Sequence, residues 1–146
     1  MSIVMSESER QEFLAGVHVG IVSIDEDGRG PLTVPVWYDY EPGGDLWFVT
    51  PGGSRKATLL AEGARMSLCA QTEDLPPKYV SVEGPVVAID QADIEEHVTP
   101  MAQRYLGEEL GAAYVAGARE GETGEVVVRL RPERWYSADF AKRLEE

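Results

Sequence analysis

The chain has 146 residues, of which 43% are hydrophobic and 27% are charged, so it is long enough for one domain with a genuine core. Its formal net charge of −13 argues against a nucleic-acid partner and against an anionic membrane surface. The single cysteine, Cys69, excludes an intrachain disulfide and a cysteine-rich zinc site, and it favours the cytoplasm. Residues 1–10 lack the layout of a signal peptide, and no run approaches the ~20 apolar residues of a membrane span.

The first half of the chain predicts one helix and three strands. Gly20 coincides with a change of phase in the apolar pattern, which predicts a bulge or bend there. Pro35 cannot donate to a strand ladder, so it predicts an edge, a bulge or a gap in pairing. The helix is expected at residues 6–14 and the strands at 17–24, 32–40 and 45–50, with hairpin turns between the strands.

The second half predicts further strands and a helical region. Gly84 and Pro85 lie inside a long strand and predict a kink that helps to curl a sheet into a barrel. Pro100 predicts a weak or kinked point in a helix. After a short helix that begins at Ser54, strands are expected at 65–71, 78–89 and 125–131, the last continuing through 133–137, with helices at 92–106 and 108–118, a turn at 121–124 and a charged tail at 139–146.

These elements predict a mainly β protein with peripheral helices. The six strands are joined mostly by hairpins, and such a chain closes most naturally into a six-stranded antiparallel barrel. No repeat, low-complexity block or linker divides the sequence, so residues 1–146 are expected to form a single domain.

The stretch from Thr50 to Leu60 is the strongest candidate for a functional site. Pro51 and two glycines end a strand, and Ser54 is a good N-cap for the helix that follows. Arg55 and Lys56 then fall in the first helical turn, where the helix dipole disfavours cations. A phosphate group would satisfy the free amides, the serine hydroxyl and both side chains together. The alternative is that both side chains simply point to water.

Other reactive side chains give weaker signals. His18 is expected in the core or at an interface, His97 in solvent, and Cys69 as a small packed residue. None has the neighbours of a nucleophilic triad, and no dinucleotide or phosphate-loop motif is present. Trp37 remains a candidate ligand contact because it follows the unusual Pro35 strand. The chemistry is therefore expected to come from a bound cofactor.

Three segments, Val34–Tyr38, Leu46–Ala57 and Arg65–Leu68, resemble the pyridoxamine phosphate oxidase-like superfamily. The resemblance implies the FMN-binding split-barrel fold, with a core at about residues 13–138, and a homodimer that holds its cofactors at the subunit interface. It also implies a set of cofactor contacts. By this resemblance the cofactor phosphate would be held by Ser54, Arg55 and Lys56, and the ring and ribityl chain would be lined by Val36, Trp37, Val49 and Thr50.

Two departures from the family pattern argue against vitamin B6 oxidation. Thr33 and Tyr38 stand where the true oxidases carry cofactor-binding Arg and Lys, and the segment 129–131 does not match their Arg-Leu-His substrate signature. The chain looks more like short split-barrel reductases, many of which use the deazaflavin coenzyme F420. Lys78 would then be available for the anionic tail of F420. The sequence leaves FMN and F420 open.

The leading hypothesis is a flavin- or deazaflavin-dependent oxidoreductase that transfers hydride to a small conjugated or heteroaromatic substrate. Solvent or Tyr38 would be available as a proton donor, and no side chain is selected as catalytic. A second hypothesis is a split-barrel module that binds a flavin or heme without turnover. A third is a barrel dimer that has lost its cofactor.

Overall fold

The structure, a computed structural model, describes residues 2–121 and 124–145. The turn predicted at 121–124 and the end of the predicted tail lie partly outside these residues. Within them, no helix is both long enough and apolar enough to cross a bilayer. The elements in chain order are α1 (Glu7–Ala15), β1 (Val19–Ile24), β2 (Leu32–Tyr40), β3 (Leu46–Pro51), α2 (Arg55–Leu59), β4 (Arg65–Thr72), β5 (Lys78–Gln91), the π-helix η1 (Ile94–Val98), α3 (Thr99–Gly121), β6 (Glu125–Leu130), β7 (Arg134–Asp139) and the 3₁₀ helix η2 (Phe140–Leu144).

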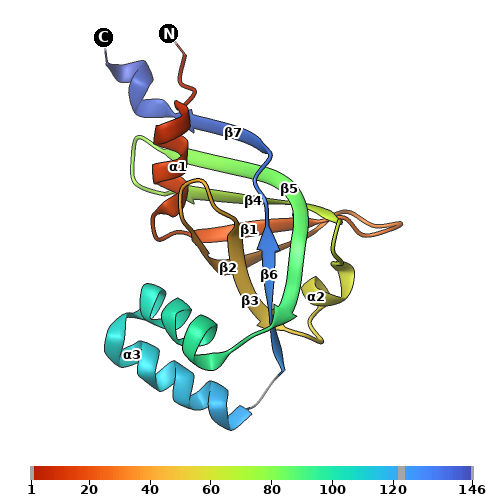
Figure 1. Ribbon diagram of the computed structural model, residues 1–146. Helices are drawn as coiled ribbons and strands as arrows, with labels where there is room; N and C mark the ends of the chain where they lie inside the picture. Colours follow the sequence, from red (N-terminus) through yellow and green to blue (C-terminus); the bar gives the residue numbers. More distant parts are fainter. Residues whose placement is uncertain (1, 122–123, 146) are drawn as a thin grey trace.

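Strands β1 to β6 form a closed antiparallel barrel, which confirms the predicted fold class. They are hydrogen-bonded in the order β4-β1-β2-β3-β6-β5, and β4 also pairs with β5 to close the circle. Closure removes the unpaired edges that an open sheet would expose. Helix α1 and both chain ends lie at one end of the barrel, and α3 lies at the other (Figure 1).

The seventh strand, β7, corrects the prediction that residues 133–137 continue β6. Strand β6 pairs with the second part of β5, from Val86 to Gln91, whereas β7 pairs with its first part, from Lys78 to Glu83. The chain changes partner where β5 bends, as predicted, at Gly84 and Pro85. A Cβ on Gly84 would lie 1.8 Å from the carbonyl oxygen of Arg131, so only glycine permits this crossing.

The predicted bulge at Gly20 is absent, because β1 pairs with both β2 and β4 in unbroken register. Gly20 is buried, and a Cβ there would lie 2.8 Å from a methyl carbon of Leu68. The apolar residues on either side of Gly20 therefore face outward. Val19 is 50% exposed and Ile21 is 38% exposed, which leaves an apolar surface on the outside of the barrel.

Helix α3 is divided into two helical segments at Gly107, as the sequence indicates. Gly107 has φ 83° and ψ 178°, a conformation that side-chain-bearing residues avoid. The helix predicted at 92–106 changes from the π-helix η1 to the α-helix α3 between Val98 and Thr99. Pro100 lies directly after this change, where the sequence predicts a weak or kinked point.

The barrel interior forms one hydrophobic core. A second, smaller cluster of Val98, Ala102 and Val115 holds the two halves of α3 together beside the barrel. The largest fully buried side chains of the main core are Tyr38, Phe48, Leu14, Ile24, Leu46, Leu68 and Leu130. The pocket described below lies between these two clusters.

Candidate functional site

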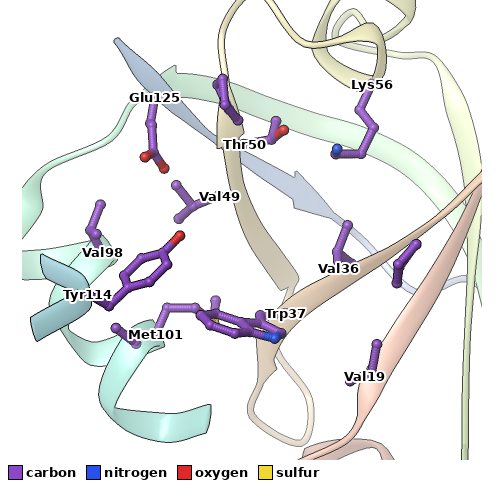
Figure 2. A pocket seen from close by; sticks show the side chains of 13 residues that line it. Val19, Val36, Trp37, Val49, Thr50, Lys56, Val98, Met101, Tyr114 and Glu125 are labelled. Atoms are coloured by element: carbon purple, nitrogen blue, oxygen red, sulfur yellow. The ribbon is translucent and has the colours of Figure 1, made fainter. Parts of the chain in front are cut away.

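A pocket of about 370 Å³ opens between the barrel wall and α3. Strands β1, β2 and β3 supply one wall, η1 and α3 supply the opposite wall, and α2 supplies one corner (Figure 2). Its volume falls in the range of small-molecule sites. The lining residues are Val19, Pro35, Val36, Trp37, Val49, Thr50, Pro51, Lys56, Val98, Met101, Ala102, Tyr114 and Glu125.

The polar corner of this pocket is built from the β3–α2 turn. The Ser54 amide donates to the Pro51 carbonyl at 2.9 Å, and the Ser54 hydroxyl accepts from the Ala57 amide at 3.2 Å. Ser54 is therefore the N-cap of α2, as predicted. The hydroxyls of Ser54 and Thr50 lie 3.0 Å apart and hydrogen-bond to each other, which fixes both oxygens at the start of the helix.

The two neighbouring cations point in different directions. Lys56 lines the pocket, and its ammonium group extends into it (Figure 2). Arg55 instead forms an ion pair and hydrogen bond with Glu26, a buried carboxylate from the β1–β2 turn. The Arg55 side chain is 59% exposed and does not line the pocket. Lys56 is thus the cation that a ligand in the pocket meets first.

The remaining barrel wall is apolar and aromatic. Val36 of β2 and Val49 of β3 line the barrel side of the pocket. The Trp37 indole lies beside Met101 of α3 (Figure 2). The indole stacks on the ring of Tyr105, with centroids 5.1 Å apart and planes at 8°. Tyr114 approaches the same indole at 5.5 Å and 49°. A flat ligand ring therefore finds a preformed aromatic and aliphatic surface.

The structure brings together most of the residues that the sequence indicated. Val36, Trp37, Val49, Thr50 and Lys56 line the pocket directly. Ser54 adjoins it through its hydrogen bond to Thr50. The other two predicted residues, Arg55 and Lys78, lie outside its lining. Lys78 is the first residue of β5, whereas the pocket adjoins the last residues of that strand through the pairing of Gln91 with Val126.

Sequence reasoning missed the wall contributed by η1 and α3. Val98, Met101 and Ala102 lie in the region that the sequence predicts as a helix at 92–106, and no motif there indicated a ligand contact. All three line the pocket. Tyr114 and Glu125 come from elements with no local motif, so no signal in the sequence marked them.

The histidines and the cysteine lie away from this lining. His18 donates from Nε2 to the Phe13 carbonyl at 2.9 Å and stacks on the Phe13 ring, and burial lowers its pKa. His97 was predicted to lie in solvent, but it is half-buried and has protein partners. It accepts the Asp93 amide hydrogen at 2.9 Å and contacts the edge of Trp47, because η1 turns the ring toward β3. Cys69 is partly buried, which raises the pKa of its thiol.

Comparison with known proteins decides the family. The sequence model described as Pyridoxamine 5'-phosphate oxidase matches residues 6–139 of this chain. The chain belongs to the pyridoxamine 5'-phosphate oxidase family. None of the curated proteins matches the sequence.

Solved structures of this family have the same fold. The conserved hypothetical protein Rv2991 from Mycobacterium tuberculosis superposes with a TM-score of 0.76 at 26% identity, covering 99% of this chain and 91% of that one. A protein described as an F420 reductase has a TM-score of 0.67 at 16% identity, covering 86% and 94%. An FAD-binding protein from Mycobacterium smegmatis has a TM-score of 0.61 at 16% identity, covering 92% and 96%.

The donor set of the pocket fits a phosphorylated flavin-type cofactor. The Thr50 hydroxyl and the Lys56 ammonium group line the polar corner, and the Ser54 hydroxyl adjoins them through its hydrogen bond to Thr50. These are the groups that bind a phosphate. The aromatic and aliphatic wall beside them suits a planar ring system.

Proposed function

We propose that the protein is a cytoplasmic oxidoreductase that uses FMN or coenzyme F420 to transfer hydride to a small conjugated or heteroaromatic substrate. One observation carries this proposal. A single pocket joins a polar corner, lined by Thr50 and Lys56 with Ser54 hydrogen-bonded to Thr50, to an apolar wall that includes Trp37. A cofactor with a phosphate at one end and a planar ring at the other matches both parts.

Each part of the pocket has a stated role in this proposal. Lys56 and the two hydroxyls bind the phosphate, and Val36 and Val49 exclude water from the ring. Trp37 supports the ring, and the bound cofactor supplies the hydride chemistry. The protein thus contributes binding, orientation and a dry environment, and no side chain is assigned as a catalytic acid or base.

The comparisons support this class of cofactor. Structures with the same fold include proteins named as an F420 reductase and as FAD-binding proteins. Both FMN and F420 present a phosphate to the same corner, so both stay in the proposal. Vitamin B6 oxidation is not part of it, because Thr33 and Tyr38 replace the basic residues of the true oxidases.

Titration of the purified protein with FMN and with F420, followed by fluorescence, tests the proposal. Saturable binding of one cofactor is expected, with substitution of Lys56 by Ala weakening it by roughly tenfold or more, the value of one charge-assisted hydrogen bond. Arg143→Ala is the control, because Arg143 is an exposed cation of η2 outside the pocket lining and is not assigned to either cofactor. Failure of both cofactors to bind overturns the proposal.

We further propose that the functional unit is a homodimer with the cofactor at the subunit interface. The outward apolar residues of β1 support this, because Val19 lines the pocket and is itself 50% exposed. A second copy covering this surface would bury it and close the pocket at the same time. Measurement of the mass in solution tests the dimer, and a monomer that binds cofactor fully would contradict it.

The second candidate function is binding of a flavin or heme without turnover. A protein described as FAD- and heme-binding, from Mycobacterium smegmatis, has the same fold with a TM-score of 0.59 at 16% identity. The absorption spectrum discriminates between the candidates. A yellow sample that bleaches with a reductant and is reoxidised by substrate supports the enzyme, whereas a Soret band supports heme. A protein that has lost its cofactor would show no change in ligand affinity when both Arg55 and Lys56 are replaced by Ala.

A further inference from the structure

The barrel has a gap between β1 and β2 directly beside the pocket. Their pairing ends at Val19 and Trp37, and β2 then pairs with β3 from Tyr38 onward. The backbone groups of His18 and Tyr38 therefore face each other without a ladder between them. Buried backbone groups need hydrogen-bond partners, so something else must fill this gap.

The hydroxyl of Tyr105, which comes from α3, occupies the gap. It accepts the Tyr38 amide hydrogen at 3.0 Å. It also lies 2.6 Å from the His18 carbonyl oxygen and 3.0 Å from the Tyr38 carbonyl oxygen, and its single proton is shared between them. One phenol thus replaces the missing ladder bonds between the two strands.

Arg104 fixes the same end of α3 to the barrel. Its guanidinium donates to the Tyr38 carbonyl at 3.2 Å and to the carbonyls of Ala15 and Gly16 at 3.0 and 2.9 Å. It also lies 3.3 Å from a carboxylate oxygen of Asp39. A guanidinium can make these bonds together because its donors form a rigid fork. The position of Tyr105 is therefore set by several independent contacts.

The ring of Tyr105 lies against Trp37. The two rings are almost parallel, at 8°, with centroids 5.1 Å apart. The stacked Tyr105 ring therefore sets the orientation of the indole face that lines the pocket. Tyr105 connects three things through one side chain, namely the strand gap, the indole and the helix that forms the opposite pocket wall.

We infer that Tyr105 is a positioning residue that holds the Trp37 indole and the α3 wall at a fixed separation, so that the pocket is formed before a ligand enters. The inference rests on the proposed function only in naming Trp37 as a contact of the cofactor ring. Preorganisation of this kind raises affinity, because the ordering cost is met during folding and not during binding.

The mobility of the Trp37 indole tests this directly, without any cofactor. In a background where Trp47 and Trp135 are replaced by Phe, Trp37 is the only tryptophan. Replacing Tyr105 by Leu removes both the ring and the hydroxyl, and we expect faster quenching by acrylamide and lower fluorescence anisotropy. Tyr105→Phe keeps the ring but removes the hydroxyl that fills the strand gap, so we expect a change in quenching and anisotropy smaller than that of Tyr105→Leu. Tyr105→Met serves where the Leu variant does not fold.

Tyr114→Leu is the matched control. Tyr114 contacts the same indole but is 47% exposed, so its removal should change the anisotropy less than removal of Tyr105. Unchanged quenching in both Tyr105→Leu and Tyr105→Met, or a change in Tyr114→Leu as large as that in Tyr105→Leu, overturns the inference.

Cofactor titration of the same variants gives the second readout. Loss of Tyr105 is expected to weaken FMN or F420 binding by roughly tenfold, the usual effect of removing the support of a binding residue. If neither cofactor binds even the parent protein, the proposed function fails, while the anisotropy result still decides the role of Tyr105. If the cofactor binds the Leu variant as tightly as the parent, the inference fails and the proposed function stands.

Discussion

Arg55 and Lys56 are neighbours in the sequence, but their side chains have different surroundings. Lys56 lines the pocket, and Arg55 neutralises the buried carboxylate of Glu26. A buried carboxylate without a partner is costly, so Arg55 stabilises the turn that carries Lys56. In the proposed function the two cations therefore have different roles, Lys56 as a contact of the ligand and Arg55 as a partner that stabilises the fold.

Replacing Arg55 with Ala is expected to lower stability more than it lowers phosphate affinity. The free energy of unfolding should fall by roughly 1 kcal/mol, a value reduced from that of a fully buried pair because Arg55 is largely exposed. Lys56→Ala should show the reverse, with unchanged urea midpoint and weaker FMN or F420 binding. Urea unfolding and fluorescence titration of both variants measure these effects. Equal losses of affinity in the two variants would contradict this division of roles.

His18 makes stability depend on pH. Burial favours its neutral form and lowers its pKa below the usual 6.5, although the Phe13 carbonyl opposes part of the shift. Above pH 6.5 the imidazole is neutral in both the folded and the unfolded chain, so His18 adds no pH dependence. As the pH falls below 6.5, the unfolded chain takes up a proton more readily than the folded one, and stability decreases.

We therefore expect the urea midpoint of the wild-type protein to fall between pH 7.5 and pH 5.5. His18→Gln should reduce this fall, because an amide can still donate to the Phe13 carbonyl but does not titrate in this range. Parallel urea titrations of both proteins at the two pH values provide the measurement. An equal fall in the variant would place the titrating group elsewhere.

At the scale of elements, the sequence predicts what local chemistry determines. The strand, turn and capped helix around Ser54 occur as expected, because proline, glycine and a serine cap act over a few residues. The break at Gly107 is likewise visible from sequence. The separate strand β7 is not, because its pairing with β5 depends on where the chain crosses Gly84 in three dimensions.

The same limit applies to the pocket. The ion pair of Arg55 with Glu26 joins residues 29 positions apart, and the bonds of Tyr105 to the β1–β2 gap span 67 and 87 positions. No local periodicity records such contacts. The family resemblance indicated the residues of β2 and β3 that line the pocket, but only the structure shows the α3 wall. The apolar face of α3 cannot be distinguished by sequence from a face that packs in the core, because a pocket lining and a core interior need the same residue types.

Substitution of Gly84 tests whether the close crossing at this residue is needed for β5 to pair with both β6 and β7. Gly84→Ala places a Cβ 1.8 Å from the Arg131 carbonyl oxygen, so the crossing chain must move and both pairings suffer. We expect a loss of more than about 4 kcal/mol, or failure to fold, in the range seen for severe steric substitutions. Gly30→Ala is the control, since no atom lies within 4 Å of a Cβ there. Soluble yield and the urea midpoint measure the difference.

At the scale of the whole molecule, the homodimer proposed above needs a surface on which a second copy can pack, and we expect it on the outer face of β1. Directly paired residues on neighbouring strands share a face, and one such row runs across four strands from Ile21 to Tyr136. Ile21 is 38% and Tyr136 61% exposed. The chain carries a net charge of −13, so a surface between two copies must be apolar to avoid repulsion between like charges. This row, which consists of Ile21, Cys69, Ser81 and Tyr136, carries no charged side chain, and Val19 on the same face of β1 lines the pocket.

Ile21→Glu tests the homodimer and its link to the cofactor together. A carboxylate in the row would be buried against its symmetry mate, and the cost of desolvating two like charges should shift the mass in solution from dimer to monomer. Val19 lies two residues from Ile21 on the same face of β1 and lines the pocket. Loss of the dimer should therefore also lower the affinity for FMN or F420. Leu144→Glu adds the same charge at a residue that is 71% exposed outside the barrel, and it should change neither property. Light scattering and cofactor titration of the two variants give the answer, and a monomeric Ile21→Glu protein that binds cofactor as tightly as wild type would show that the site is complete within one subunit.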